Sequence, residues 1–133
     1  MKPYSFILLA LLLTTTLIPA ARAQSGTDEV KAVLEEGLRT HLSGIYPPKG
    51  CEDNGSLHDY AGAYKISQHS TVNGTLRLTG QAKVSYRNAR TAGTGSVEFL
   101  AEFDKQGGQT VLTKLRWRKG GCMPLTTLYE AAD

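Results

Sequence analysis

The stretch TLRLTGQAKVSYRN, Thr75 to Asn88, alternates two kinds of side chain over a dozen positions. Apolar or small residues take every second position, and polar or basic residues take the positions between them. The two sets are Leu76, Leu78, Gly80, Ala82, Val84, Tyr86 and Arg77, Thr79, Gln81, Lys83, Ser85, Arg87. A period of two puts alternate side chains on opposite faces of a β-strand. The stretch therefore predicts a long antiparallel strand with one core face and one solvated face.

Three more segments share this period, namely Tyr60–Ser67, Ser96–Asp104 and Thr110–Arg118. Between the first two strands lies Asn73-Gly74, a dipeptide favoured in tight hairpin turns. In the last hairpin, matching the apolar positions predicts Phe103 opposite Val111 and Glu98 opposite Arg116. The same register turns Val111, Thr113, Leu115 and Trp117 inward.

An amphipathic helix is predicted before the strands. Apolar residues recur at intervals of three and four, as on one helix face: Val30, Val33, Leu34, Leu38, His41 and Leu42. Ser43-Gly44 ends the helix, and YPPKGCEDNGS, residues 46–56, reads as an irregular loop. The helix has one apolar stripe and the sheet has one apolar face, so each can bury the other. The predicted fold class is α+β, with one N-terminal helix on a curved four-stranded antiparallel meander.

This order of elements resembles the cystatin-like and nuclear-transport-factor-like folds in shape. The chain carries no motif of either family, including the glutamine-valine-glycine signature of the first cystatin hairpin. The resemblance concerns shape and implies no function.

The first 23 residues have the pattern of a secretory signal peptide. Lys2 supplies the charged start, residues 6–13 are an unbroken apolar run, and Ala21-Arg22-Ala23 is a cleavage site, which predicts a mature chain beginning at Gln24. Threonines and Pro19 interrupt the apolar run before the roughly 20 residues that a membrane helix needs. We therefore expect a secreted or periplasmic protein without stable membrane insertion, whose residues 24–133 form one domain.

The chain has two cysteines, Cys51 and Cys122. An oxidising compartment favours a disulfide between them, whereas no CxxC or HxxxH spacing points to a metal site. Loss of the signal also removes Lys2 and Arg22, so the formal charge falls from +3 to +1. Acidic residues dominate before Tyr60 and basic residues after it, which predicts a dipolar molecule.

Two surfaces of the predicted sheet are candidate sites. The side chains at the centre of the core face are unusually small, so a pocket between sheet and helix could form there. The candidate lining residues are Gly80, Ala82, Tyr86, Ala101, Thr113 and His41. The alternative is that the small residues admit a close approach of the helix backbone, or that Gly80 marks a bulge. On the solvated face, a partner surface could include Leu100, Leu112, Arg77, Lys83, Arg87, Lys114 and Arg116.

The basic residues on the solvated face, such as Arg77, Lys83 and Arg87, do not predict nucleic-acid binding. Proteins that bind single strands place aromatic rings between the charges, but the aromatic residues of this sheet fall on the core face. Glu98 and Glu102 also stand between the two basic strands and can neutralise them.

No cofactor motif and no catalytic constellation emerges; His58 and Asp59 could do acid–base chemistry, but exposed turns commonly contain such residues. The leading hypothesis is a non-enzymatic protein that binds another macromolecule, as an inhibitor, immunity factor or envelope accessory component. The alternative is a small-molecule carrier or lyase that uses the pocket.

Overall fold

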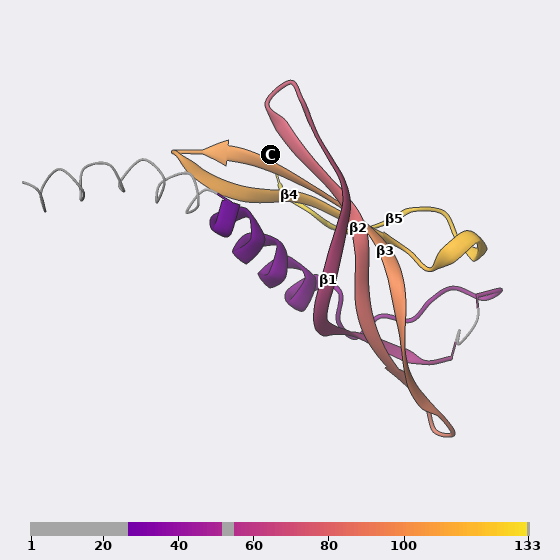
Figure 1. Cartoon of the computed structure of the whole chain (residues 1–133). Coiled ribbons are helices and arrows are strands. Elements are labelled where there is room, and N and C mark those ends of the chain that lie inside the picture. Colours follow the sequence, from indigo (N-terminus) through magenta and orange to yellow (C-terminus); the bar gives the residue numbers. More distant parts are fainter. Residues whose placement is uncertain (1–26, 52–54, 133) are drawn as a thin grey trace, which may run out of the picture. The chain divides into compact units, whose positions relative to one another are not determined.

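The computed structural model describes residues 27–51 and 55–132 (Figure 1). Residues 27–41 are helical, and five strands follow: β1 (Leu57–Val72), β2 (Thr75–Arg87), β3 (Ala92–Gln106), β4 (Gln109–Arg118) and β5 (Thr126–Glu130). A single 3-10 turn, Gly120–Cys122, stands between β4 and β5. The chain divides into two compact units after Ala32, and the helical residues from Val33 onward belong to the same unit as the sheet. The expected signal peptide lies outside the described residues.

The α+β class is confirmed, with one helix and one antiparallel sheet among the described residues. Each strand pairs with the next along the chain, in the order β1-β2-β3-β4-β5. The expected count of four strands is wrong, because Thr126–Glu130 pairs with β4 as a fifth strand. β1 and β5 are the two edges of the sheet.

The core lies between the inner face of the sheet and the helical residues from Val33 onward. Leu34, Leu38 and Leu42 have no exposed surface, and they recur at the predicted four-residue spacing. From the sheet, the buried apolar residues are Leu78, Ala82, Val84, Val97, Phe99, Ala101, Phe103, Leu112, Leu115 and Trp117. A Cβ on Gly37 would lie 2.6 Å from Cδ2 of Leu112, so this helical glycine marks a close approach of helix and sheet.

The register of the β3–β4 hairpin differs from the prediction. Gly107 and Gly108 have φ values of 58° and 80° and form a two-residue turn, which pairs Gln106 with Gln109. A bulge then leaves Thr113 without a partner in the ladder, so the strands beyond it shift by one more residue. As a result Phe99 pairs with Trp117 and Glu98 with Arg118.

This bulge corrects two expectations about side chains. Leu112, expected on the solvated face, is 7% exposed and belongs to the core. Thr113, expected to face inward, is half-buried and its hydroxyl donates to the carbonyl oxygen of Glu102 at 3.1 Å. The alternation of apolar residues could not place the extra residue, because Leu112 and Thr113 fit the pattern almost equally well on either face.

Gly80 lies close against the backbone of β1. A Cβ on this residue would stand 2.0 Å from the carbonyl oxygen of Lys65. The register of β1 against β2 shifts between Tyr60 and Tyr64 and again between Ile66 and Gln68, so Gly80 pairs beside a bulge. The space beside its α-carbon is therefore filled by a neighbouring strand, not by the helix.

The expected disulfide joins Cys51 to Cys122, with a Cα–Cα distance of 5.0 Å. It connects the loop that follows the helix to the 3-10 turn that follows β4. Both cysteines lie near the start of β1, which the loop also contacts through the bridge between Ile45 and His58.

Candidate functional site

A buried polar cluster lies at the start of β1, beside the disulfide. His58, expected in an exposed loop, is a strand residue with no exposed surface. Its Nδ1 lies 2.9 Å from the carbonyl oxygen of Ser56, and its Nε2 lies 2.7 Å from Nζ of Lys119. The Tyr86 ring stacks on the imidazole at 5.5 Å, with the ammonium of Lys119 5.3 Å from that ring's centre.

These contacts fix the state of the imidazole. A carbonyl oxygen only accepts hydrogen bonds, so Nδ1 of His58 must carry the proton. An ammonium group only donates, so the Nε2 lone pair is the acceptor in the 2.7 Å contact with Lys119. A general base must reach its substrate, and this ring is fully buried. The geometry therefore favours a role for His58 in holding β1, the loop and Lys119 together.

A second polar group joins the helix to β1. The Tyr60 hydroxyl donates to Oε2 of Glu35 at 2.5 Å, and Oε1 of the same carboxylate pairs with Arg39 at 2.6 Å. The Arg39 guanidinium also lies 5.4 Å from the centre of the Tyr60 ring. Burial raises the pKa of Tyr60 far above its usual value, and the hydrogen bond to Glu35 raises it further. Burial likewise raises the pKa of Tyr64, with a smaller contribution from Glu35.

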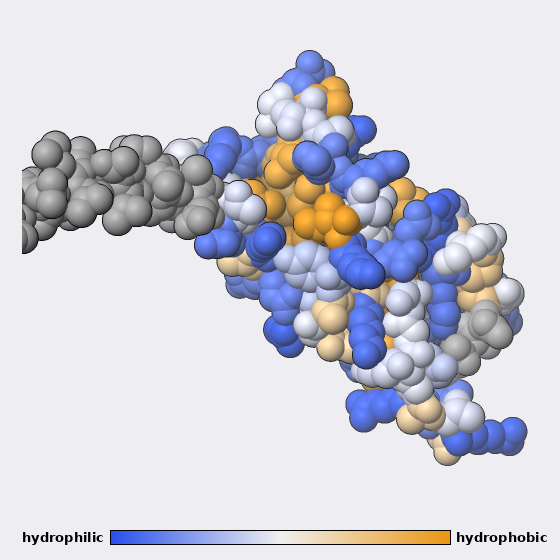
Figure 2. Space-filling model, in the orientation of Figure 1, coloured by the Kyte–Doolittle hydropathy of each residue, from blue (hydrophilic) through white to orange (hydrophobic). Residues whose placement is uncertain are grey.

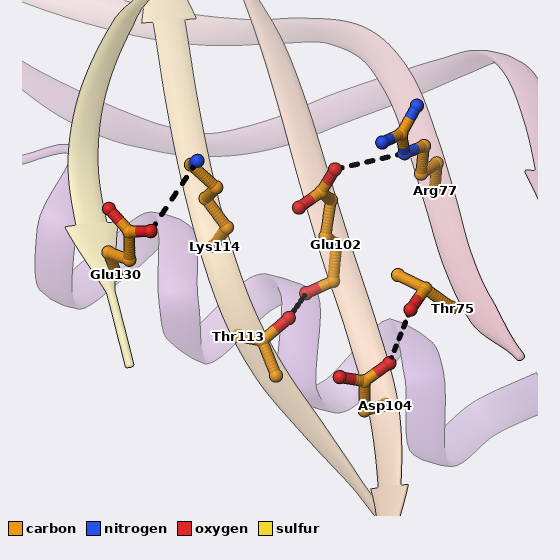
Figure 3. Close-up of polar contacts among 7 residues, drawn as sticks. All are labelled: Thr75, Arg77, Glu102, Asp104, Thr113, Lys114 and Glu130. Carbon is orange, nitrogen blue, oxygen red and sulfur yellow. Dashed lines mark hydrogen bonds and ion pairs between the residues drawn. The ribbon is translucent and has the colours of Figure 1, made fainter. Parts of the chain in front are cut away.

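The outer face of the sheet is ion-paired on its β3–β5 side (Figure 3). Glu102 pairs with Arg77 at 2.9 Å, and Glu130 pairs with Lys114 at 3.5 Å. Oε2 of Glu98 accepts from Nε and Nη2 of Arg118, at 3.0 and 2.8 Å. Asp104 accepts from the Thr75 hydroxyl at 2.7 Å. The expected neutralisation by β3 is confirmed for Arg77 and Arg118, although Arg118 replaces Arg116 as the partner of Glu98. Lys114 is neutralised by Glu130 of β5 instead.

The β1–β2 side of the same face is different. Lys65, Lys83 and Arg87 are exposed and have no ion pair within residues 27–51 and 55–132. Lys65 and Lys83 line an open hollow of about 330 Å³. The other lining residues are neutral: Ala63, Tyr64, Gln81, Thr94, Gly95 and Ser96. This hollow is cationic, in contrast to the ion-paired region beside it.

Only part of the expected partner surface is available on this face. Arg77 and Lys114 are engaged in ion pairs, and Leu112 lies in the core. Leu100 is half-buried opposite Arg116, whose buried Nε has no hydrogen-bond partner. Of the expected cations, Lys83, Arg87 and Arg116 have no ion pair within the described residues, and of these Lys83 and Arg87 are exposed.

The six expected pocket residues are not brought together. Gly80, Ala82 and Ala101 are buried in the sheet, Tyr86 stacks on His58, and Thr113 lies at the bulge. His41 stacks on Tyr129 of β5 at 4.2 Å, and these two rings line a hollow of about 210 Å³ together with Leu112 and helical residues.

Sequence reasoning missed the His58–Lys119 contact and the role of Lys65. Extending the alternation of the first strand two residues upstream from Tyr60 would have placed His58 on the core face. The alternation of the same segment places Lys65 on the solvated face, but the register shift near Gly62, whose φ is 81°, decides that Lys65 stands opposite Gln81.

The exposed part of β1 also carries apolar side chains. Ile66 is 40% exposed and Val72 is 48% exposed. Figure 2 shows hydrophobic side chains gathered near the base of the projecting β1–β2 hairpin. An exposed strand with mixed apolar and basic residues is a candidate contact surface for a protein.

Three further observations bear on function. The described residues contain no group of three or more histidine, cysteine or acidic residues that could hold a metal ion. In that part of the chain, every helix is too short or too polar to cross a bilayer. Comparisons with protein-family models, curated proteins and solved structures give no match to this chain.

Proposed function

We propose that this protein is secreted or periplasmic and acts without catalysis, by binding another protein along the open edge of β1. One observation carries the proposal: from Ala61 to Val72, β1 has a neighbouring strand on one side only, and every side chain except that of Tyr64 is exposed. An edge strand with unpaired backbone groups can add a strand from another chain. Inhibitor, immunity and envelope accessory roles all fit this mode of binding.

The first residues of β1 are protected from such pairing. The N–H and carbonyl of His58 bond to Ile45 at 2.7 and 3.1 Å, and the N–H of Tyr60 donates to Leu42 at 2.8 Å. The loop after the helix thus acts as a neighbour for the start of the strand. The edge from Ala61 onward has no such cover among the described residues.

The hairpin turn identifies backbone groups that face outward. Asn73 and Gly74 have φ values of 52° and 82° and form a two-residue turn, so the flanking pair Val72 and Thr75 exchanges its hydrogen bonds internally. Alternation along the antiparallel ladder then directs the N–H and carbonyl of His69 and Thr71 away from β2. These groups are the ones that an added strand would bond.

The extracytoplasmic location is supported by the disulfide between Cys51 and Cys122 and by the signal-like sequence of residues 1–23. A cystatin-like or nuclear-transport-factor-like shape is part of the same proposal, since a helix packed on an antiparallel meander is common to both. We draw no activity from that shape.

The proposal is tested by affinity capture with three baits: the wild-type protein, His69→Ala and His69→Pro. Proline removes the outward N–H without removing a bond of the β1–β2 ladder, and alanine removes the side chain alone. We expect one extracytoplasmic protein to be retained by the wild type and by His69→Ala and to be lost from His69→Pro. Equal retention by His69→Pro, folded as judged by circular dichroism, would refute binding through this edge.

The hollow beside Tyr129 favours a second candidate, a small-molecule site between helix and sheet. His41 supplies a polar group there and Leu112 an apolar wall. A ligand in this hollow would disturb the ring contact between His41 and Tyr129, which tyrosine fluorescence or the aromatic NMR signals would report. Absence of any co-purifying metabolite from the native source would count against this candidate.

A further inference from the structure

The cations of the outer face are divided unequally between its two sides. The carboxylates of Glu98, Glu102 and Glu130 each have a basic partner, and Asp104 has the Thr75 hydroxyl. Three exposed cations without an ion pair among the described residues, Lys65, Lys83 and Arg87, lie on β1 and β2, next to the open edge; on β4, Arg116 also has no ion pair but is half-buried. The carboxylates nearest to them by register are Asp59, opposite Ser85, and Glu98, opposite Gln81. Both are engaged, since Oδ1 of Asp59 accepts from the N–H of Gly44 at 2.8 Å and Glu98 pairs with Arg118 at 2.8 Å.

The hollow between these strands is suited to a carboxylate. Two ammonium groups line it, and Gln81, Thr94 and Ser96 add neutral groups that can donate hydrogen bonds. Like charges around a concave surface reinforce one another and raise the local concentration of anions. Ala63 also lines the hollow. Because its side chain is only a methyl group, a longer side chain from an added strand could extend past it across β1 to Lys83.

A strand added to β1 would place side chains next to this hollow. Neighbouring strands lie about 4.8 Å apart, and side chains on one face recur about every 6.6 Å. Lys65 stands opposite Gln81 of β2 and its side chain is exposed, so a strand added on the other side of β1 would bring side chains next to it. Glutamate side chains on such a strand would reach Lys65 directly and Lys83 across Ala63.

We propose that the partner segment bound by β1 is an extended acidic peptide whose carboxylates bind at Lys65 and Lys83. This inference rests on the proposed function and adds the chemistry of the partner. A second copy of this chain is a less suitable occupant, because its β1 strand carries no glutamate and would bring another Lys65 toward the hollow.

The test compares blocked peptides of sequence TVEVEVT and TVQVQVT, which differ only in whether the residues on one face are charged. Binding is measured by calorimetry at low salt, and protection of the His69 and Thr71 amides by hydrogen exchange. We expect the glutamate peptide to bind about fivefold more tightly than the glutamine peptide, as two exposed ion pairs would give. That advantage should vanish in Lys65→Gln/Lys83→Gln and in 0.5 M salt, about three times physiological ionic strength.

A matched control is Lys49→Gln/Arg90→Gln, which removes two exposed cations that do not line the hollow. This variant should keep the preference for the glutamate peptide, because the net charge changes equally in both variants. Loss of the preference in the control as well would show a general charge effect and overturn the assignment to Lys65 and Lys83.

The remaining outcomes separate this inference from the proposed function. Equal binding of both peptides with protection of the two amides would refute acidic selection and leave edge binding intact. Selective binding of the glutamate peptide without amide protection would refute edge binding and leave the anion site intact. No binding of either peptide at millimolar concentration, or dimerisation of the free protein through β1, would overturn both.

Discussion

Replacing Gly80 by alanine tests whether the small residues of β2 leave space or mark contact. The new Cβ would lie 2.0 Å from the carbonyl oxygen of Lys65, whereas ordinary contact begins at 3.4 Å. The oxygen belongs to the backbone, so the two strands must separate locally by roughly 1.4 Å to restore ordinary contact. The strain falls on a ladder segment that the nearby bulge already interrupts.

The cost follows from this displacement. Overpacking a close contact typically costs about 1–3 kcal/mol, and a weakened ladder bond adds about 1 kcal/mol. Alanine offsets about 0.5–1 kcal/mol of this loss of stability, because glycine loses more backbone entropy than alanine on folding. The expected net loss is about 1–3.5 kcal/mol of unfolding free energy, or roughly 5–15 °C in Tm for a domain of this size.

The assay is urea unfolding followed by circular dichroism, with Gly95→Ala as the matched control. Gly95 lies on the neighbouring strand, and a Cβ there would meet Cε1 of Tyr86 at 3.7 Å, an ordinary contact. The control should therefore be neutral or slightly stabilising. If Gly80→Ala were as stable as Gly95→Ala, β1 would not fill this space, and the expectation of a pocket at Gly80 would regain support.

Three other outcomes are expected. Because the folded-state pKa of Tyr60 lies above its unfolded value of 10.0, the stability it contributes is complete below pH 10 and is lost as the pH rises beyond it. Urea unfolding at pH 9 and 11 should show this loss, which Tyr60→Phe should reduce. Removing both cysteines should cost about 4 kcal/mol, since the disulfide closes a loop with a sequence separation of 71; a loss below 1 kcal/mol would contradict a tether of that length. His58→Ala should cost about 2–4 kcal/mol by leaving Lys119 near a buried void, and a neutral result in thermal unfolding would contradict the structural role of this ring.

The spacing of apolar residues in the sequence was sufficient to predict the buried faces of the helix and of β2. The three-and-four spacing of Leu34, Leu38 and Leu42 predicts the helix face that is buried, and the alternation from Leu76 to Val84 predicts the inner face of β2. Both periods are consequences of backbone geometry and need no distant contact. The cysteine pair was also predictable, because only two cysteines exist.

Only the tertiary structure shows where a strand contains an extra residue and how the strand register changes beyond it. The bulge at Thr113 moved Leu112 into the core and gave Glu98 the partner Arg118, and the shifts in β1 placed the Lys65 carbonyl against Gly80. Such shifts move side chains between faces without altering the composition of either strand. Whether a lysine is paired or free then depends on which residue stands opposite it. The sequence by itself therefore determined the layers of this protein, and strand pairing decided that Lys65 and Lys83, unlike Arg77 and Arg118, lack a partner in the described chain.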